Sequence, residues 1–177
     1  MWLAPLGWPV QEPIYGRSPE VAESAFVAKQ SALIGDVTVG ERSTVWPFTC
    51  LRGDDSEMPT TVGDECNVQE FSMLHGATLE DRVSIGHNVT VDYATVGEHS
   101  LVGINSAVLR GATVGSNCLV AAGSLVRQGQ TVPDGHLAYG VPAETRPLSE
   151  TQREEIAMVH EHYVELGRDY RETDRFE

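Results

Sequence analysis

Residues 96–125, VGEHSL VGINSA VLRGAT VGSNCL VAAGSL, form five units of six residues that each begin with valine. The fifth residue of every unit is serine, alanine or cysteine, and glycine often follows the opening valine. One aliphatic and one small inward-facing residue per six, with a turn-forming glycine or polar residue between them, are typical of a short strand followed by a corner. We therefore predict repeated short strands joined by tight corners.

The same period extends over most of the chain. It is interrupted by a polar stretch at 54–61, and it shortens by one residue before Leu79 and before Val96. The residues that open the units are Val21, Val27, Leu33, Val39, Val45, Leu51, Val62, Val68, Leu74, Leu79, Ile85, Val91, Val96, Val102, Val108, Val114, Val120, Val126 and Val132. Three such units close a triangular coil of about 18 residues, and stacked coils form a parallel β-helix. We predict an all-β solenoid over 18–146, preceded by an N-terminal extension at 1–17.

The repeat ends near Pro147, where helical spacing replaces it. Ser149-Glu150-Thr151-Gln152 reads as a capping box, and apolar residues then recur at Ile156, Val159 and Tyr163. We predict a C-terminal helix over about 149–167 within a last segment, 147–177, that ends in a charged tail.

The composition excludes several classes of partner. The chain has 12 Lys+Arg against 26 Asp+Glu, a formal charge of −14, and Lys29 is its one lysine. Nucleic acid and anionic membranes are therefore poor partners, and no apolar run approaches the ~18 residues of a membrane span. An evenly acidic, lysine-poor chain is typical of salt-accumulating microbes, so we expect a halophilic, archaeal source; an ordinary acidic bacterial protein is the alternative.

The expected compartment is the cytoplasm. The opening residues lack the basic patch and long apolar stretch of a secretory signal. Cys50, Cys66 and Cys118 are odd in number, widely spaced and without a C-x-x-C pair. Buried thiols in a reducing compartment fit this pattern better than disulfides or a cysteine zinc site.

Unit counting places two polar side chains one above the other. Leu74 and Val91 open units on the same face of successive coils, so His75 and Asp92 stack about 4.8 Å apart and can address one metal. The same count stacks Leu51, Val68 and Ile85 on another face. It thereby aligns Arg52, Gln69 and Gly86, with His87 following at a neighbouring corner.

Residues on two faces of one solenoid cannot easily meet outside its own core. Packing around a threefold axis places one face of a protomer against a different face of its neighbour. His87 of one copy could then complete a site begun by His75 and Asp92 of another. This geometry predicts a homotrimer with three interfacial sites.

Several motifs together resemble a known family. They are Arg52-Gly53-Asp54, Val62-Gly63-Asp64, Asn67-Val68-Gln69 followed by Leu74-His75, Gly86-His87, and Gly140-x-Pro142-Ala143. Over about 18–148 the chain is similar to the gamma-class carbonic anhydrases and their relatives among the left-handed, hexapeptide-repeat β-helix proteins. The resemblance implies a left-handed solenoid and a homotrimeric enzyme that hydrates CO2 reversibly to bicarbonate through a metal-bound hydroxide. Zinc is the implied metal, with iron or another divalent metal as alternatives.

The resemblance also implies roles for individual residues. His75 and His87 fall at the positions of two of the three zinc ligands. Arg52 and Asp54 look like the family's interfacial ion pair. Gln69 matches the residue that hydrogen-bonds to the zinc-bound water, and Asp55 matches an acidic residue used for proton transfer.

One departure from the family bears on the metal. The third ligand is a histidine five residues after the second, and Asp92 stands there in this chain. Two histidines and a carboxylate form an acceptable set for zinc or ferrous iron. A carboxylate makes bound water less acidic, and aspartate is shorter than histidine, so the site could be weakened or degenerate.

Two other functions stay open. Many hexapeptide solenoids are acyltransferases that use a coenzyme A thioester, commonly with an exposed histidine base. A catalytically inactive scaffold trimer is the second, and the replaced ligand is its best support.

Overall fold

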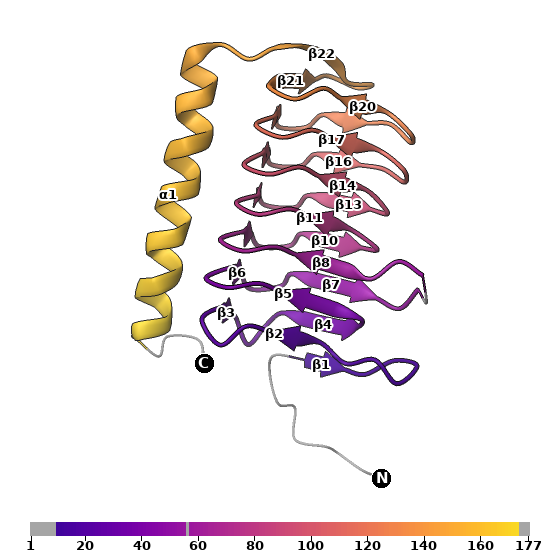
Figure 1. Ribbon diagram of the computed structural model, residues 1–177, viewed down its shortest axis with the longest axis vertical. Coiled ribbons are helices and arrows are strands. Elements are labelled where there is room, and N and C mark those ends of the chain that lie inside the picture. Colours follow the sequence, from indigo (N-terminus) through magenta and orange to yellow (C-terminus); the bar gives the residue numbers. More distant parts are fainter. Residues whose placement is uncertain (1–9, 56, 174–177) are drawn as a thin grey trace.

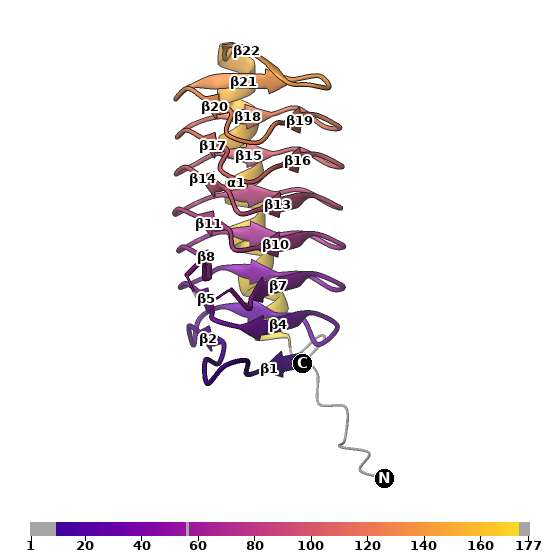
Figure 2. The ribbon, with the colours of Figure 1, turned by 90° about the vertical axis from the view of Figure 1, so that its right-hand side faces the viewer.

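The computed structural model describes residues 10–55 and 57–173. The chain winds into stacked coils that form three sheets along the sides of a prism, and one helix lies beside the stack (Figure 1). Two sheets have seven strands and the third has eight. This architecture confirms the predicted parallel β-helix with a C-terminal helix, and the coils rise regularly along the long axis (Figure 2).

Each sheet collects one strand from every coil, and all neighbouring strands are parallel except the last pair of the third sheet. Sheet 1 contains β1 (Val10–Glu12), β4 (Ala32–Gly35), β7 (Cys50–Gly53), β10 (Met73–His75), β13 (Thr90–Asp92), β16 (Ala107–Val108) and β19 (Leu125–Val126). Sheet 2 contains β2 (Glu20–Val21), β5 (Val37–Val39), β8 (Thr60–Val62), β11 (Thr78–Leu79), β14 (Thr95–Val96), β17 (Thr113–Val114) and β20 (Thr131–Val132). Sheet 3 contains β3 (Phe26–Val27), β6 (Thr44–Val45), β9 (Asn67–Val68), β12 (Ser84–Ile85), β15 (Leu101–Val102), β18 (Leu119–Val120), β21 (His136–Tyr139) and the antiparallel β22 (Glu144–Pro147).

The aliphatic residues of the repeat fill the interior. Leu51, Leu74 and Val91 are fully buried and lie in register on neighbouring strands of sheet 1. Burying each such side chain contributes about 1.5–3 kcal/mol. The small fifth residues bond the coils together: the Ser72 hydroxyl donates to the carbonyl oxygen of Gly86 at 2.8 Å and accepts from the backbone N–H of Val89 at 3.1 Å. The six-residue pattern therefore encodes both the packing and the corners.

The register differs from the prediction at the polar stretch. Leu51 pairs with Leu74 in sheet 1, whereas Val68 belongs to sheet 3, so the predicted stack of Leu51 on Val68 is wrong. The reason is that β8 of sheet 2 follows β7 of sheet 1 in the usual order, so the polar stretch between them does not replace a strand. The polar stretch is an insertion at the corner between sheets 1 and 2.

The boundaries also shift. β1 pairs with β4 although its residues fall within the range predicted as an N-terminal extension. Helix α1 spans Glu150–Glu172, five residues beyond the predicted end, and begins with the predicted capping box between Ser149 and Gln152. The end of the predicted tail, 174–177, lies outside the described residues.

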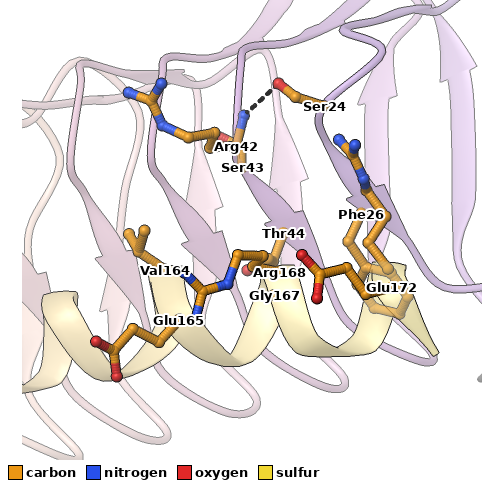
Figure 3. Close-up of a pocket in the computed structure, with 11 residues that line it drawn as sticks. Ser24, Phe26, Arg42, Ser43, Thr44, Val164, Glu165, Gly167, Arg168 and Glu172 are labelled. Carbon is orange, nitrogen blue, oxygen red and sulfur yellow. Dashed lines mark hydrogen bonds between the residues drawn. The ribbon is translucent and has the colours of Figure 1, made fainter.

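Helix α1 runs back along the stack from the last coil to the first, over β3, β6 and β9 of sheet 3 (Figure 1). A Cβ atom at Gly167 would lie 2.2 Å from the Cγ2 atom of Thr44, so glycine is needed for this close approach. Nearby, α1 and the first coils enclose a cleft of about 380 Å3 between Phe26 and Val164 (Figure 3). Within 10–55 and 57–173, no helix is long and apolar enough to cross a membrane.

Candidate functional site

A vertical row of polar side chains marks sheet 1. Because β7, β10 and β13 pair in register, Arg52, His75 and Asp92 follow one another on successive coils. The Nδ1 atom of His75 lies 2.9 Å from Oδ1 of Asp92, and the His75 side chain is only 14% exposed. The predicted stacking of His75 and Asp92 is confirmed. Arg52 lies in register with His75, so the predicted alignment of Arg52 with Gln69 is wrong.

Arg52 and Asp54 surround the other ring nitrogen of His75. Arg52 Nη2 donates to His75 Nε2 at 3.0 Å, and Arg52 Nε donates to Asp54 Oδ1 at 2.9 Å. Since a guanidinium cannot accept, Nε2 must be the acceptor, so the imidazole proton sits on Nδ1 and is donated to Asp92. The predicted Arg52–Asp54 ion pair therefore forms within one protomer; its place at an interface stays a prediction.

Tyr93 joins this site, and sequence reasoning missed it. Its hydroxyl lies 3.1 Å from His75 Nε2 and donates to Asp55 Oδ2 at 3.2 Å. The edge of one ring packs on the other, with the Tyr93 and His75 centroids 4.4 Å apart, and Arg110 lies 3.7 Å over the Tyr93 ring. The repeat specifies the inward residues and says little about the corner residues. The only sign of Tyr93 in the sequence was an aromatic residue at a position where a turn-forming residue is usual.

These contacts determine the local ionisation. The backbone N–H of Glu57 and then the Tyr93 hydroxyl hold the pKa of Asp55 below its usual range. Burial, followed by the hydrogen bond and negative charge of Asp55, raises the pKa of Tyr93. Asp55 is therefore a carboxylate and Tyr93 a neutral phenol at neutral pH.

Gln69 and His87 lie elsewhere in the protomer. Both line a groove of about 480 Å3 between sheet 3 and α1, together with apolar residues such as Leu101 and Val159. Gln69 Nε2 donates to Asn67 Oδ1 at 3.0 Å. His87 Nδ1 lies 2.8 Å from Glu70 Oε2. The single protomer does not bring these two side chains to His75, which agrees with the prediction that they occupy another face.

His75 and Asp92 provide two of the ligand atoms that a divalent metal needs. Tetrahedral zinc with ligands about 2.0–2.1 Å away holds two donor atoms roughly 3.3 Å apart, close to the observed 2.9 Å between His75 Nδ1 and Asp92 Oδ1. Among residues 10–55 and 57–173, however, no three histidine, cysteine or acidic side chains converge to hold a metal. The pair fits the metal only if a further donor comes from another copy of the chain.

Comparison with known proteins places the fold in a family. Residues 93–128 match the family model described as bacterial transferase hexapeptide (six repeats). The chain is 41% identical over 165 residues to a carbonic anhydrase of Geobacillus kaustophilus (strain HTA426), covering 90% of each chain. It is also 31% identical over 166 residues to the mitochondrial gamma carbonic anhydrase 2 of Arabidopsis thaliana, covering 87% of this chain and 59% of the relative. The chain belongs to a hexapeptide-repeat family that has gamma carbonic anhydrase homologues.

The hexapeptide-repeat family also contains proteins with transferase names. A solved hexapeptide transferase family protein from Anaplasma phagocytophilum superposes with a TM-score of 0.86 at 34% identity, over 91% of this chain and 98% of that one. The shared solenoid therefore does not distinguish CO2 hydration from acyl transfer, so the distinction depends on the side chains around His75. None of these relatives bears on the halophilic, archaeal source, which stays a prediction.

Proposed function

We propose that this protein is a gamma-carbonic-anhydrase-like metalloenzyme that catalyses the reversible hydration of CO2 to bicarbonate. The observation that carries the proposal is the His75–Asp92 pair, whose donor atoms lie 2.9 Å apart on adjacent coils. The 41% identity to a carbonic anhydrase along nearly the whole chain supports it. Zinc, or iron in its place, would be held by His75 and Asp92 of one protomer and His87 of its neighbour in a homotrimer.

The metal, when bound, supplies a Lewis acid that activates water for attack on CO2. Before binding, His75 Nδ1 must lose its proton. The proton of the neutral ring then moves to Nε2, so the 3.0 Å hydrogen bond from Arg52 Nη2 has to be released, and Asp54 Oδ1, 3.3 Å away, can accept the proton in a hydrogen bond. Arg52 holds Asp54 in place through the 2.9 Å bond from Nε. Arg52 and Asp54 are thus positioning residues for His75.

Gln69 and Asp55 take the remaining roles that the resemblance implies. The Gln69 amide of the neighbouring copy, which lines the same groove as His87, orients the attacking water. Asp55, ionised at neutral pH and bonded to Tyr93, accepts the proton that leaves the site and passes it to solvent. Because Asp92, a carboxylate, replaces a neutral imidazole as the third ligand and adds negative charge to the metal, we expect weaker activation of water at neutral pH than with three imidazoles.

The experiment is metal analysis paired with stopped-flow CO2 hydration. Wild type and a His99→Ala control should carry about one metal per protomer and show hydration that a chelator abolishes. His75→Ala should lose both the metal and the activity. Hydration that survives in His75→Ala would contradict the proposal. An intact assembly with neither metal nor activity would instead favour a scaffold role.

Acyl transfer is the second candidate, favoured by the transferase description of the matching family model and by the Anaplasma structure. In that case the groove beside His87 would have to accept a coenzyme A thioester, and His87 would act as the base. Turnover of acetyl-CoA with a small amine or alcohol, unaffected by chelator and without CO2 hydration, would support this alternative.

A further inference from the structure

Two phenylalanines form an exposed stack on the corner between sheets 3 and 1. Phe48 and Phe71 are 58% and 62% exposed. Their ring centroids lie 5.3 Å apart, and the planes differ by 11°. A stacked pair of large apolar rings that stays in water is a feature of interaction surfaces.

The backbone at both positions is unfavourable for phenylalanine. Phe48 and Phe71 have φ of 63° and 64°, in the left-handed region that bulky side chains rarely adopt. Each stands three residues after the end of a strand of sheet 3. The same place in the next three coils is taken by Asn88, Asn105 and Gly123, which are residues suited to this conformation. Phenylalanine occupies this place although both its exposure to water and its positive φ are unfavourable. Among the five coils compared, it does so only in these two.

His87, the metal donor that lies away from His75 in the single protomer, is on the same corner. His87 comes directly before Asn88, and its counterpart one coil below, Glu70, comes directly before Phe71 and contacts His87 at 2.8 Å. One coil above, the counterpart is Ile104, which is 44% exposed. His87 therefore lies on the same corner as the Phe48–Phe71 stack, with Glu70 below it and the exposed Ile104 above it.

The coils also match in height. Phe71 precedes β10 in its coil and so lies level with His75, whereas His87 precedes β13 and lies level with Asp92. When solenoids pack side by side around a threefold axis parallel to the stack, each coil meets the same coil of its neighbour. His87 then faces the level of the neighbour's Asp92, and Phe71 faces the level of its His75.

We propose that the Phe48–Phe71 stack is the apolar anchor of the contact between copies of this chain, and that it walls the site of the adjoining copy on its His75 side. The inference rests on the proposed function for the shared site. A second copy is the occupant because His75 and Asp92 need a third donor, and the available donor, His87, lies on the same corner as the stack. An apolar wall there excludes water around the site and suits an apolar substrate such as CO2.

The test is sedimentation equilibrium of a Phe48→Asn/Phe71→Asn double variant. Asparagine already occupies the equivalent place at Asn88 and Asn105, so the substitution relieves the backbone and should leave the circular dichroism spectrum unchanged. We expect a trimeric wild type and at least a tenfold weaker association in the double variant. Met158→Gln, which replaces a 63% exposed apolar residue on α1, is the matched control and should associate like wild type.

The contrary outcomes separate this inference from the proposed function. If the double variant associates as tightly as wild type, the anchor is wrong while the shared metal site still stands. A wild type that is monomeric at all concentrations overturns the anchor. In that case, metal content and CO2 hydration of wild type and His75→Ala still decide the chemistry on their own.

Discussion

Among individual residues, Gly76 and Tyr93 depend on each other, because the Tyr93 ring fills the space that a side chain at Gly76 would need. A Cβ atom at Gly76 would lie 2.6 Å from Tyr93 Cδ1. Gly76→Ala should therefore displace the ring from His75 and cost about 1–3 kcal/mol of unfolding free energy from overpacking, besides the strain of alanine at positive φ. Urea denaturation measures this free energy.

Gly111→Ala is the matched control for that variant. Gly111 has φ of 71°, comparable to the 54° of Gly76, but its added Cβ would meet nothing closer than 3.9 Å. It carries the backbone strain alone, so it should be the less destabilising of the two. Equal losses in both variants would mean that the Tyr93 ring yields easily and does not brace His75.

The sequence could predict some of this site and not the rest, for definite reasons. His75 and Asp92 are 17 residues apart, one coil whose only irregularity is the one-residue shortening before Leu79, so counting units found their contact. Arg52 escaped the count because the insertion at 54–59 lies between it and His75. Tyr93 escaped because its side chain is at a corner, where the periodic pattern constrains only the turn.

On the scale of elements, the docking of α1 depends on a buried histidine. His160 is 7% exposed; its Nδ1 has no hydrogen-bond partner, and its Nε2 lies 3.6 Å from Glu65 Oε2. Burial, followed by electrostatic repulsion from His99 and Arg82, lowers the pKa of His160, although Glu65 and Glu161 oppose the shift. The helix therefore packs with a neutral imidazole against the coils.

This burial predicts a pH dependence. In the unfolded chain His160 protonates near pH 6.5, whereas in the folded protein it protonates only at lower pH. Stability should therefore fall as pH drops below about 6.5 and on through the folded pKa. His160→Gln should flatten this decline in urea denaturation between pH 7 and 5. His162→Gln, on the exposed side of α1, should keep the wild-type slope; an identical slope in His160→Gln would contradict the account.

The end of α1 lies beyond the predicted one. Apolar residues continue at helical spacing past Tyr163, at Leu166 and Tyr170, and the helix continues to Glu172. Tyr163 and Tyr170 pack edge-on against Trp46, and Tyr170 also meets Phe26. These tertiary contacts with the first coils support the last turns of the helix. A contact between segments more than a hundred residues apart leaves no local signal in the sequence.

For the whole molecule, charge should oppose assembly. Each copy carries a formal −14, so like-charged copies repel each other at low ionic strength. Raising the salt concentration from about 0.05 to 0.5 M shortens the screening length and should tighten association at least severalfold. Sedimentation equilibrium at several salt concentrations measures this. Weaker association at high salt would mean that attractive ion pairs, and not apolar contacts, dominate the interface.

We expect each active site to need His75 from one copy and His87 from another. The direct measurement mixes His75→Ala with His87→Ala in equal amounts, after dissociation and reassembly, and follows CO2 hydration. Each variant alone should be inactive. In randomly mixed trimers about a quarter of the interfaces regain both histidines, so about a quarter of wild-type activity should return. If wild type is active and the reassembled mixture stays as inactive as either variant, the site is not shared between copies, and the account is wrong.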